Sequence, residues 1–359
     1  MPQSKYFKFA VWLLVILLIL LVASQLTFIL EPIGVILTSL AAPLIISILF
    51  YYLLRPPVLL LCRFNVPKAL AILIIYLIVI GLIVAIFVGI VPRLYSEFLS
   101  LINNMPHFVK QFSHQMYEIE KSPFLKKMGL NNVTLTNVAN RFSKNMSQMT
   151  TSIVNNTLSI IQSVTGTMLL VVTIPFILFY LLKDGEGMAR TLVRFIPEEH
   201  RERGRDILKD MDGALSGYIQ GQMIVLLFDF VCILIWYSAI HLHYSLILAL
   251  VILVTNVIPF IGSFIATVPA VIVAFIQDPV LAIYVIIGVI VVQQIEGNVV
   301  SPFVMGRKLD VHPLTIICIL LVAGNLAGII GMLLAIPFYA VCKVVVTRVY
   351  QLIQLRRHN

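Results

Sequence analysis

Charged residues are scarce in this sequence of 359 residues, at 11% of the chain, whereas they make up about a quarter of a soluble globular domain. Hydrophobic residues account for 60%. They gather in charge-free runs at residues 9–30, 32–54, 69–92, 145–182, 230–277 and 311–342. Each run reaches the roughly 20 residues that a helix needs to cross a bilayer. The sequence therefore excludes a soluble protein and predicts an all-α polytopic membrane protein.

Motifs of common enzymes and pumps are also missing. The sequence holds no HExxH, GxSxG or Walker pattern. It has four cysteines, none in a CxxC pair, and His241, His243 and His312 show no metal-ligand spacing. We read the cysteines as small apolar packing residues, namely Cys62, Cys232, Cys318 and Cys342. We therefore expect no enzymatic activity, no metal site and no cofactor, and a drive by ATP would need a partner protein.

The net charge of +9 raises the question of a nucleic-acid partner. However, the basic residues flank apolar runs, where they set topology and contact anionic lipid headgroups. Basic residues are enriched at the N-terminus, in 55–68, in 183–209 and in the C-terminal tail. We expect these four segments, and hence both termini, to be cytoplasmic. The lipid bilayer is then the expected partner, and nucleic acid is not.

The apolar runs predict about eight membrane segments. Glu31-Pro32 is expected to separate the first two, Arg55-Pro56-Pro57 to end the second, and Asp184-Gly185 to end the fourth, since proline and glycine interrupt helices. Residues 93–155 are polar, with apolar residues at helical spacing, which indicates an amphipathic helical extramembrane module after the third span. The predicted divisions are 1–92 with three spans, 93–155 as this module, 156–215 with the fourth span and a charged cytoplasmic loop, and 216–359 as the transport region.

Two apolar stretches, 244–277 and 313–346, are too long for single upright spans. Helix breakers and an amide stand at the centre of each, from Asn256 to Gly262 and from Gly324 to Gly331. Each stretch is either one tilted, kinked span or a re-entrant hairpin. Hairpins keep Arg307-Lys308 and the C-terminal tail both cytoplasmic, so the positive-inside rule favours them. Periplasmic labelling of a cysteine placed at Asp310 would count against them.

Several segments in the second half of the chain resemble the motifs of the autoinducer-2 exporter (PerM-type permease) family of bacterial membrane transporters. Their order and spacing fit best from about 181 to 337. The matching residues are Leu181–Gly185, Ser216–Gln222, Ile258–Gly262, Val268–Ala270, Gln293–Asn298, Ser301-Pro302, Met305–Arg307, His312–Leu314, Gly324–Gly331 and Ala335–Pro337.

This resemblance implies several properties. The fold would have about eight membrane segments with a soluble insertion after the third. The protein would be a homo-oligomer, expected to be a pentamer, in the bacterial inner membrane, with an elevator-like movement of its C-terminal part. Members of the family are linked to export of autoinducer-2, and others to sodium/proton antiport.

Two acidic residues are candidates for handling the solute or an ion. Glu296 ends a charge-free stretch, and a carboxylate in lipid is costly unless it faces protein, water or an ion. With Gln293 one turn earlier, it offers oxygens to a cation or polar solute, although pairing with Arg307 at the interface is an alternative. Asp229 lies near the middle of the span 217–240. It is a candidate proton or sodium carrier, or else a protonated acid inside the bundle, and it is not part of the family motif set.

The helix breaks supply further candidate site residues. Proline frees a backbone carbonyl and glycine permits close approach, so Asn256, Pro259 and Gly262 are expected to line a site or merely to form a kink. Gly324, Asn325 and Gly328 either act as ligands or pack helices tightly. Asn298, in the Glu296 motif, and Gln220, at the start of the 217–240 span, complete the candidate set.

The leading interpretation is a secondary transporter that exports a small polar solute such as autoinducer-2 by elevator-like alternating access. A sodium(lithium)/proton antiporter using Asp229 or Glu296 is one alternative, and protons or sodium are the expected coupling ions. Another alternative is a non-transporting membrane scaffold that acts through the 93–155 module.

Overall fold

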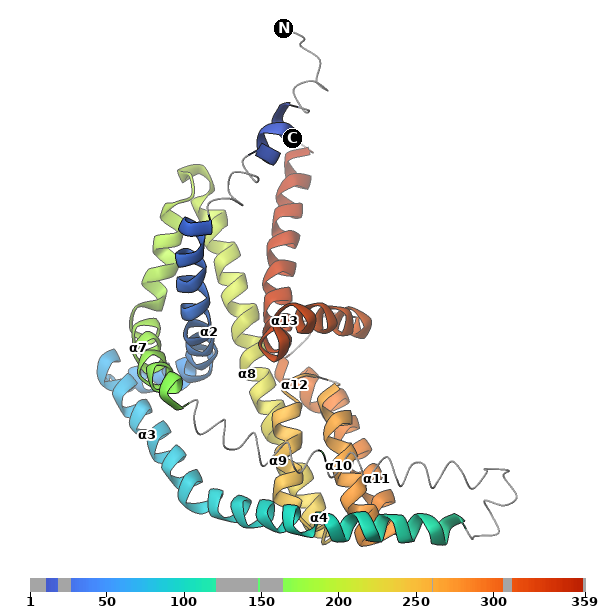
Figure 1. The fold of residues 1–359 in the computed structure, drawn as a ribbon. Helices are drawn as coiled ribbons and strands as arrows, with labels where there is room; N and C mark the ends of the chain where they lie inside the picture. The colour runs from blue at the N-terminus through green and yellow to red at the C-terminus, as the bar shows by residue number, and fades with distance from the viewer. Residues whose placement is uncertain are drawn as a thin grey trace.

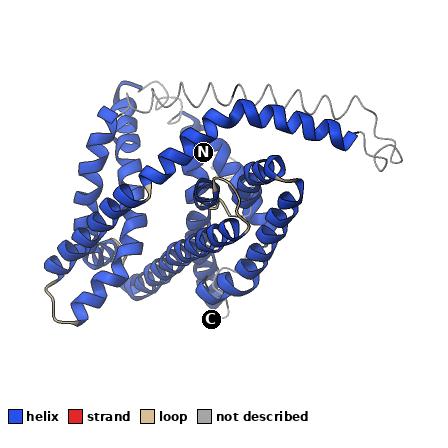
Figure 2. Cartoon of the chain, turned by 90° about the horizontal axis from the view of Figure 1, so that it is seen from below, coloured by secondary structure: helices blue, strands red, loops and turns tan. Residues whose placement is uncertain are grey.

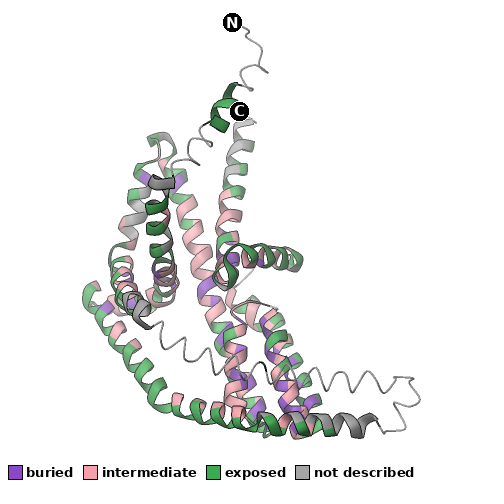
Figure 3. Ribbon diagram, viewed as in Figure 1, coloured by how far each residue is buried: buried purple, intermediate pink, exposed green. Residues whose placement is uncertain are grey.

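The computed structural model describes residues 11–18, 27–120, 148, 164–259, 261–305 and 312–357, and within these ranges all regular structure is helical (Figure 2). Five helices are long and apolar enough to cross a membrane, namely Gly34–Arg63, Lys68–Asn104, Arg201–Ala239, Pro279–Met305 and Ile330–Arg348. Large apolar side chains such as Leu77, Phe87 and Val88 are exposed along them (Figure 3). Exposed apolar area on this scale suits contact with lipid, which confirms the predicted class of helical membrane protein.

The first region of the molecule, called here the N-terminal group, consists of α2 (Thr27–Arg63), α3 (Lys68–Gly89) and α7 (Val164–Arg194) (Figure 1). These helices share a small apolar core of Val58, Ala71, Ile72, Ile75, Leu178 and Leu182. Two hydroxyl groups add hydrogen bonds to α7. Ser47 Oγ donates to the carbonyl of Ile174 at 3.1 Å, and Tyr76 Oη donates to the carbonyl of Pro175 at 2.8 Å. Polar side chains therefore support the helix backbones in this group.

Helix α2 runs through the prolines that were predicted to interrupt it, so both boundaries, at Glu31-Pro32 and at Arg55-Pro56-Pro57, were wrong. Pro56 lacks the N–H that would bond the carbonyl of Tyr52 four residues earlier. The amide of Gln220, on α8, donates to that carbonyl instead, at 2.9 Å. The lost bond is thus replaced from another helix, and α2 continues to Arg63.

Helix α7 likewise passes through Asp184-Gly185 and ends at Arg194, so this predicted end was also wrong. A Cβ at Gly185 would lie 3.0 Å from Tyr51 Oη. Gly185 therefore serves the close approach of α7 to α2 and does not end a helix.

Helix α4 (Val91–Glu120) starts two residues after α3, and Pro92 falls in its first turn, where proline is tolerated. It packs against α3, α9 and α10. Glu97 Oε2 accepts a hydrogen bond from the N–H of Ile247 at 3.2 Å, in the first turn of α9, and Asn104 Nδ2 donates to Tyr244 Oη at 3.0 Å. This is the start of the predicted 93–155 module, and most of the remainder lies outside the described residues.

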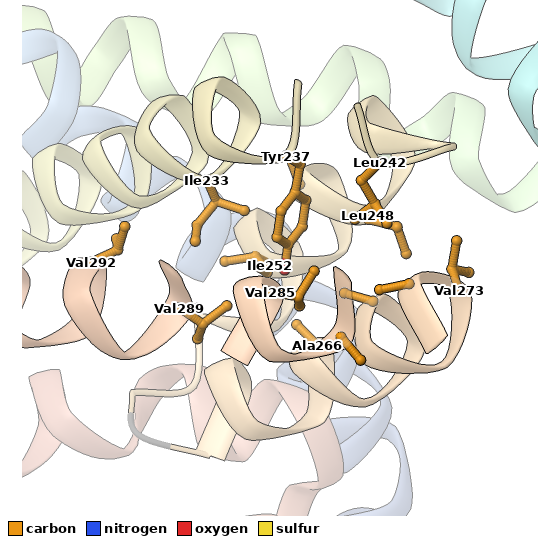
Figure 4. Close-up of a cluster of buried hydrophobic side chains, with 14 residues drawn as sticks. Ile233, Tyr237, Leu242, Leu248, Ile252, Ala266, Val273, Val285, Val289 and Val292 are labelled. Atoms are coloured by element: carbon orange, nitrogen blue, oxygen red, sulfur yellow. The ribbon is translucent and has the colours of Figure 1, made fainter. Parts of the chain in front are cut away.

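The second region, called here the C-terminal group, is built around α8 (Arg201–Ala239), which follows the short helix η1 (Glu198–His200). Its other elements are α9 (Ser245–Thr255), α10 (Ile261–Gln277), α11 (Pro279–Ile295), η2 (Glu296–Val300), α12 (Ser301–Met305) and α13 (Pro313–Arg357). Helices α8 to α11 bury a common core (Figure 4). Five of its members are alanines, and such small residues let helices approach closely, namely Ala249, Ala266, Ala270, Ala274 and Ala282.

Both long apolar stretches are interrupted, as predicted. The chain reverses between α9 and α10, because Gln277 at the end of α10 bonds back to the backbone that precedes α9. Its side chain donates to the carbonyl of His241 at 2.9 Å and accepts from the N–H of His243 at 3.0 Å. Helix α13 breaks at Ala327 and Gly328, where Gly328 has φ of 59°, and its two arms point in different directions (Figure 1).

Candidate functional site

A cavity of about 210 Å³ lies where five parts of the C-terminal group meet. They are α8, the C-terminal end of α11, η2, α12 and both arms of α13. Its polar side chains come from α8, α11, η2, α12 and α13, and its aliphatic wall comes mainly from α13. The lining residues are Tyr218, Gln222, Pro259, Gln293, Glu296, Gly297, Ser301, Met305, Ile316, Ile319, Ile336 and Tyr339. A few convergent polar groups against an apolar wall are typical of a small-molecule site.

Glu296 is placed by a change of helix type. After Ile295 the α-helix gives way to the π-helical turn η2, which starts at Glu296. Such π turns occur frequently at functional sites. Glu296 is partly buried on the cavity wall, and Gln293, one turn earlier, lines the same cavity. The two side chains that were expected to offer oxygens to a solute therefore lie at one cavity, and their role in binding stays a prediction.

A buried chain of polar side chains lies behind the cavity. Asn256 Nδ2 donates to Asp229 Oδ2 at 2.7 Å, and Ser263 Oγ donates to Asn256 Oδ1 at 2.8 Å. Gln222, on the cavity wall, donates from Nε2 to the carbonyl of Asn256 at 3.1 Å. That carbonyl belongs to the C-terminal end of α9, where helical carbonyls lack partners. The turn between α9 and α10 is thus fixed to α8 at two points.

Asp229 faces Glu296. Its side chain is 1% exposed, and its Oδ1 receives no hydrogen bond from a donor within the described part of the chain. The carboxyl group of Glu296 is among its neighbours. Carboxylates only accept hydrogen bonds, so these two can share one only when one of them carries a proton. The alternative pairing of Glu296 with Arg307 concerns a residue outside the described ranges.

Gly262 permits the tight geometry of the α9–α10 turn. A Cβ at this position would overlap the carbonyl of Thr255 and the backbone nitrogen of Asn256. Gly221 plays a similar part on α8, where a Cβ would lie 2.6 Å from Met305 Cγ on α12. Gly262 thus lets two backbone segments approach closely, and Gly221 makes room on α8 for the side chain of Met305.

The structure brings together six of the predicted site residues. Glu296, Gln293 and Pro259 line the cavity, and Asp229, Asn256 and Gly262 stand directly behind it.

The other five predicted residues lie elsewhere. Gln220 bonds to the Tyr52 carbonyl and to Ser216 Oγ. Asn298 is exposed, and its amide donates to the carbonyl and Oε1 of Gln294, both at 2.9 Å. Gly324, Asn325 and Gly328 lie at the break of α13, outside the set of cavity-lining residues. Roles for these five in solute binding stay predictions.

Sequence reasoning did not select Tyr218, Gln222, Ser301 and Tyr339, which supply polar groups to the cavity. A signal existed for the first two, because residues four apart share a helix face and both belong to the quoted Ser216–Gln222 motif. Ser301 also stood in a quoted motif. Tyr339 comes from the second arm of α13, and no local pattern marks it.

A helical membrane protein that keeps a carboxyl-lined cavity among interrupted helices belongs, by fold and site, to the class of membrane transporters. A family model described as AI-2E family transporter matches residues 9–351. The chain belongs to this family, as the motifs from Leu181 to Pro337 predicted.

The chain is also similar to proteins that are named as transport proteins or permeases. "Putative transport protein YueF" of Bacillus subtilis (strain 168) is 36% identical over 360 residues, which cover 100% of this chain and 97% of that protein. "Putative transport protein YrrI" of the same organism is 35% identical over 348 residues, covering 95% and 96%. "Putative permease PerM" of Escherichia coli (strain K12) is 27% identical over 317 residues, covering 86% and 87%.

Proposed function

We propose that this protein is a secondary transporter that exports a small polar solute such as autoinducer-2. The observation that carries the proposal is the cavity of about 210 Å³ in which Glu296, Gln293 and Gln222 face the aliphatic wall of α13. Carboxylate and amide groups can accept from and donate to a hydroxyl-rich solute. An acid retained in a membrane-spanning region is a functional-site candidate by default.

The proposed mechanism is elevator-like alternating access in an oligomer, for which the family suggests a pentamer. The C-terminal group would carry the cavity past the N-terminal group, with about eight membrane segments in all. Re-entry of 244–277 is supported by Gln277, which ties the two ends of this stretch together. The basic flanks support an inner-membrane protein with cytoplasmic termini.

Flux into proteoliposomes tests this function. Purified protein is reconstituted, and uptake of autoinducer-2, sodium and lithium is compared side by side. Glu296→Gln is expected to abolish solute flux, because it removes the charge of the cavity while keeping its volume. The matched control is Glu198→Gln, which alters an exposed acid that pairs with Arg201. Full flux in Glu296→Gln, with the control also normal, would refute the assigned role.

A sodium(lithium)/proton antiporter is the second candidate, favoured by the facing acids Asp229 and Glu296. Everted membrane vesicles distinguish it from a solute exporter. Addition of sodium or lithium would change the internal pH if the protein is an antiporter, and would leave it unchanged if it only exports a neutral solute.

A further inference from the structure

We propose that Asp229 and Glu296 form a carboxyl pair that holds one shared proton, and that uptake and release of this proton drives the transport cycle. The transport part rests on the proposed function, whereas the shared proton rests on the burial of Asp229, its unpartnered Oδ1 and the place of Glu296 on the cavity wall. Asp229 is the inner member of the pair and Glu296 the outer member, which reaches the solute cavity.

The first argument is the unsatisfied oxygen of Asp229. Oδ2 accepts from Asn256, but Oδ1 is buried and lacks a donor among the residues that the structure describes. A buried acceptor without a donor loses its hydration with nothing to replace it, which destabilises the folded state, and more so when the acceptor is charged. The facing carboxyl group of Glu296 becomes such a donor when it is protonated. One proton between the two groups therefore satisfies an oxygen that is otherwise unpaired.

The second argument is the charge of the surroundings. The neighbours contributed by α9, α10 and α11 are neutral, namely Asn256, Ser263 and Gln293. Titratable groups in the described surroundings include the thiol of Cys232 on α8 and the phenols of Tyr218 and Tyr339 at the cavity, which are neutral when protonated. Within the described ranges, no basic side chain forms an ion pair with either acid. Two ionised carboxylates would repel each other without compensation, so at most one charge is stable here.

The third argument connects the proton to movement. Asn256 stands in the turn between α9 and α10 and bonds Asp229, while Gln222 bonds the Asn256 carbonyl. Loss of the shared proton to water leaves two repelling carboxylates, one anchored to this turn and the other on the cavity wall. Repulsion between the two carboxylates favours a different position of the α9–α10 turn relative to the cavity wall. The turn and the wall would then have one arrangement with the shared proton and another without it, as coupling requires.

Infrared difference spectroscopy of the purified protein tests the shared proton without any transport assay. At neutral pH the wild type is expected to show the C=O stretch of one protonated carboxyl group that disappears in Asp229→Asn and in Glu296→Gln. Both replacements keep the shape of the side chain and provide an amide donor for the remaining carboxylate. The control Asp278→Asn, at an exposed N-cap, is expected to keep the band. A band that survives either replacement in the pair, or is absent from the wild type, overturns the proposal.

Transport measurements then separate this inference from the proposed function. In wild-type proteoliposomes an imposed pH gradient is expected to stimulate autoinducer-2 flux, and Asp229→Asn is expected to lose this stimulation, whereas the control Asp278→Asn is expected to keep it. If the band behaves as expected but autoinducer-2 does not move, the shared proton stands and the proposed substrate fails. If the Asp229→Asn flux still responds to the pH gradient, the coupling role is overturned.

Discussion

The N-terminal and C-terminal groups use polar side chains in opposite ways. In the N-terminal group, Ser47 and Tyr76 donate to backbone carbonyls of α7, so their hydrogen bonds support helices. In the C-terminal group, Asp229, Asn256 and Ser263 bond to one another and lead to a cavity. Ionisable residues that pair with other polar groups inside a membrane protein mark pathways for ions and substrates. The difference suggests that the N-terminal group has a structural role and that the C-terminal group carries the site.

Glycines show the same contrast. In the N-terminal group, a Cβ at Gly81 or Gly89 would meet nothing within 4 Å, and a Cβ at Gly185 would come no closer than 3.0 Å to the side chain of Tyr51. In the C-terminal group, a Cβ at Gly262 or Gly288 would overlap a neighbouring segment, and at Gly288 this neighbour is the indole ring of Trp236. The C-terminal group therefore depends on close packing around interrupted helices, and small changes there should have the larger effects.

The largest effect is expected from Gly262→Ala. The added methyl group overlaps the carbonyl of Thr255, so the α9–α10 turn must shift, at a cost of about 3 kcal/mol. Gly81→Ala is the matched control and should gain about 0.5–1 kcal/mol, since alanine favours a helix over glycine. Thermal unfolding in detergent, followed by tryptophan fluorescence, measures both. Equal melting temperatures for the two variants would contradict the contrast between the groups.

Ile72→Ala should have the next largest effect, because Ile72 is fully buried in the core shared by α2, α3 and α7. A large-to-small change in a core costs about 2 kcal/mol at the lower end of the usual range. We expect this lower value because lipid around the helices is itself apolar, so hydrophobic burial between them contributes less to stability. We expect a lower melting temperature but normal solute flux per folded molecule in proteoliposomes. Leu77→Ala, at an exposed position, is the control. Loss of flux without loss of stability would place the N-terminal group in the site.

The sequence predicted the fold class because charge-free runs dictate membrane helices. It also predicted six residues that now lie together, since a buried acid, an amide and a helix breaker each indicate a site locally. It did not predict that α2 continues past Pro56, because the replacement donor, Gln220, lies on α8. Nor did it find Tyr339, whose place in the cavity depends on the direction of the second arm of α13. Contacts between distant segments decide both of these.

The neighbouring amides Gln220 and Gln222, both on α8, sharpen the comparison. Gln220 bonds to the N-terminal group, whereas Gln222 belongs to the cavity of the C-terminal group. Gln220→Ala removes the donor to the Tyr52 carbonyl and should cost about 1–2 kcal/mol in stability with modest loss of flux. Gln222→Ala removes a cavity amide and the donor to Asn256, so we expect a similar loss of stability together with a marked loss of flux. Melting temperatures and flux are measured on the same preparations. Identical flux in the two variants would show that position on the cavity wall does not matter.

The smallest effects are expected at the two ion pairs that join α8 to α2 and to α13. Asp212 accepts from Arg55 Nη1 on α2, at 2.9 Å to Oδ1 and 2.7 Å to Oδ2, and Tyr52 is a further neighbour. Asp210 accepts from Arg348 Nε on α13 at 2.7 Å. Both pairs are partly exposed, so each contributes at most about 1 kcal/mol, and less at high salt.

Asp212→Ala should therefore lower the melting temperature slightly more than Asp210→Ala, because Asp212 has the additional neighbour Tyr52. If the two groups move relative to each other, the variants should also differ in flux. Loss of the Asp212 bond removes one of the bonds between α8 and the N-terminal group and is expected to alter the rate of transport, whereas loss of the Asp210 bond only loosens α13 within the C-terminal group. Equal flux at low and high salt in both variants would mean that α8 does not move against α2 during transport.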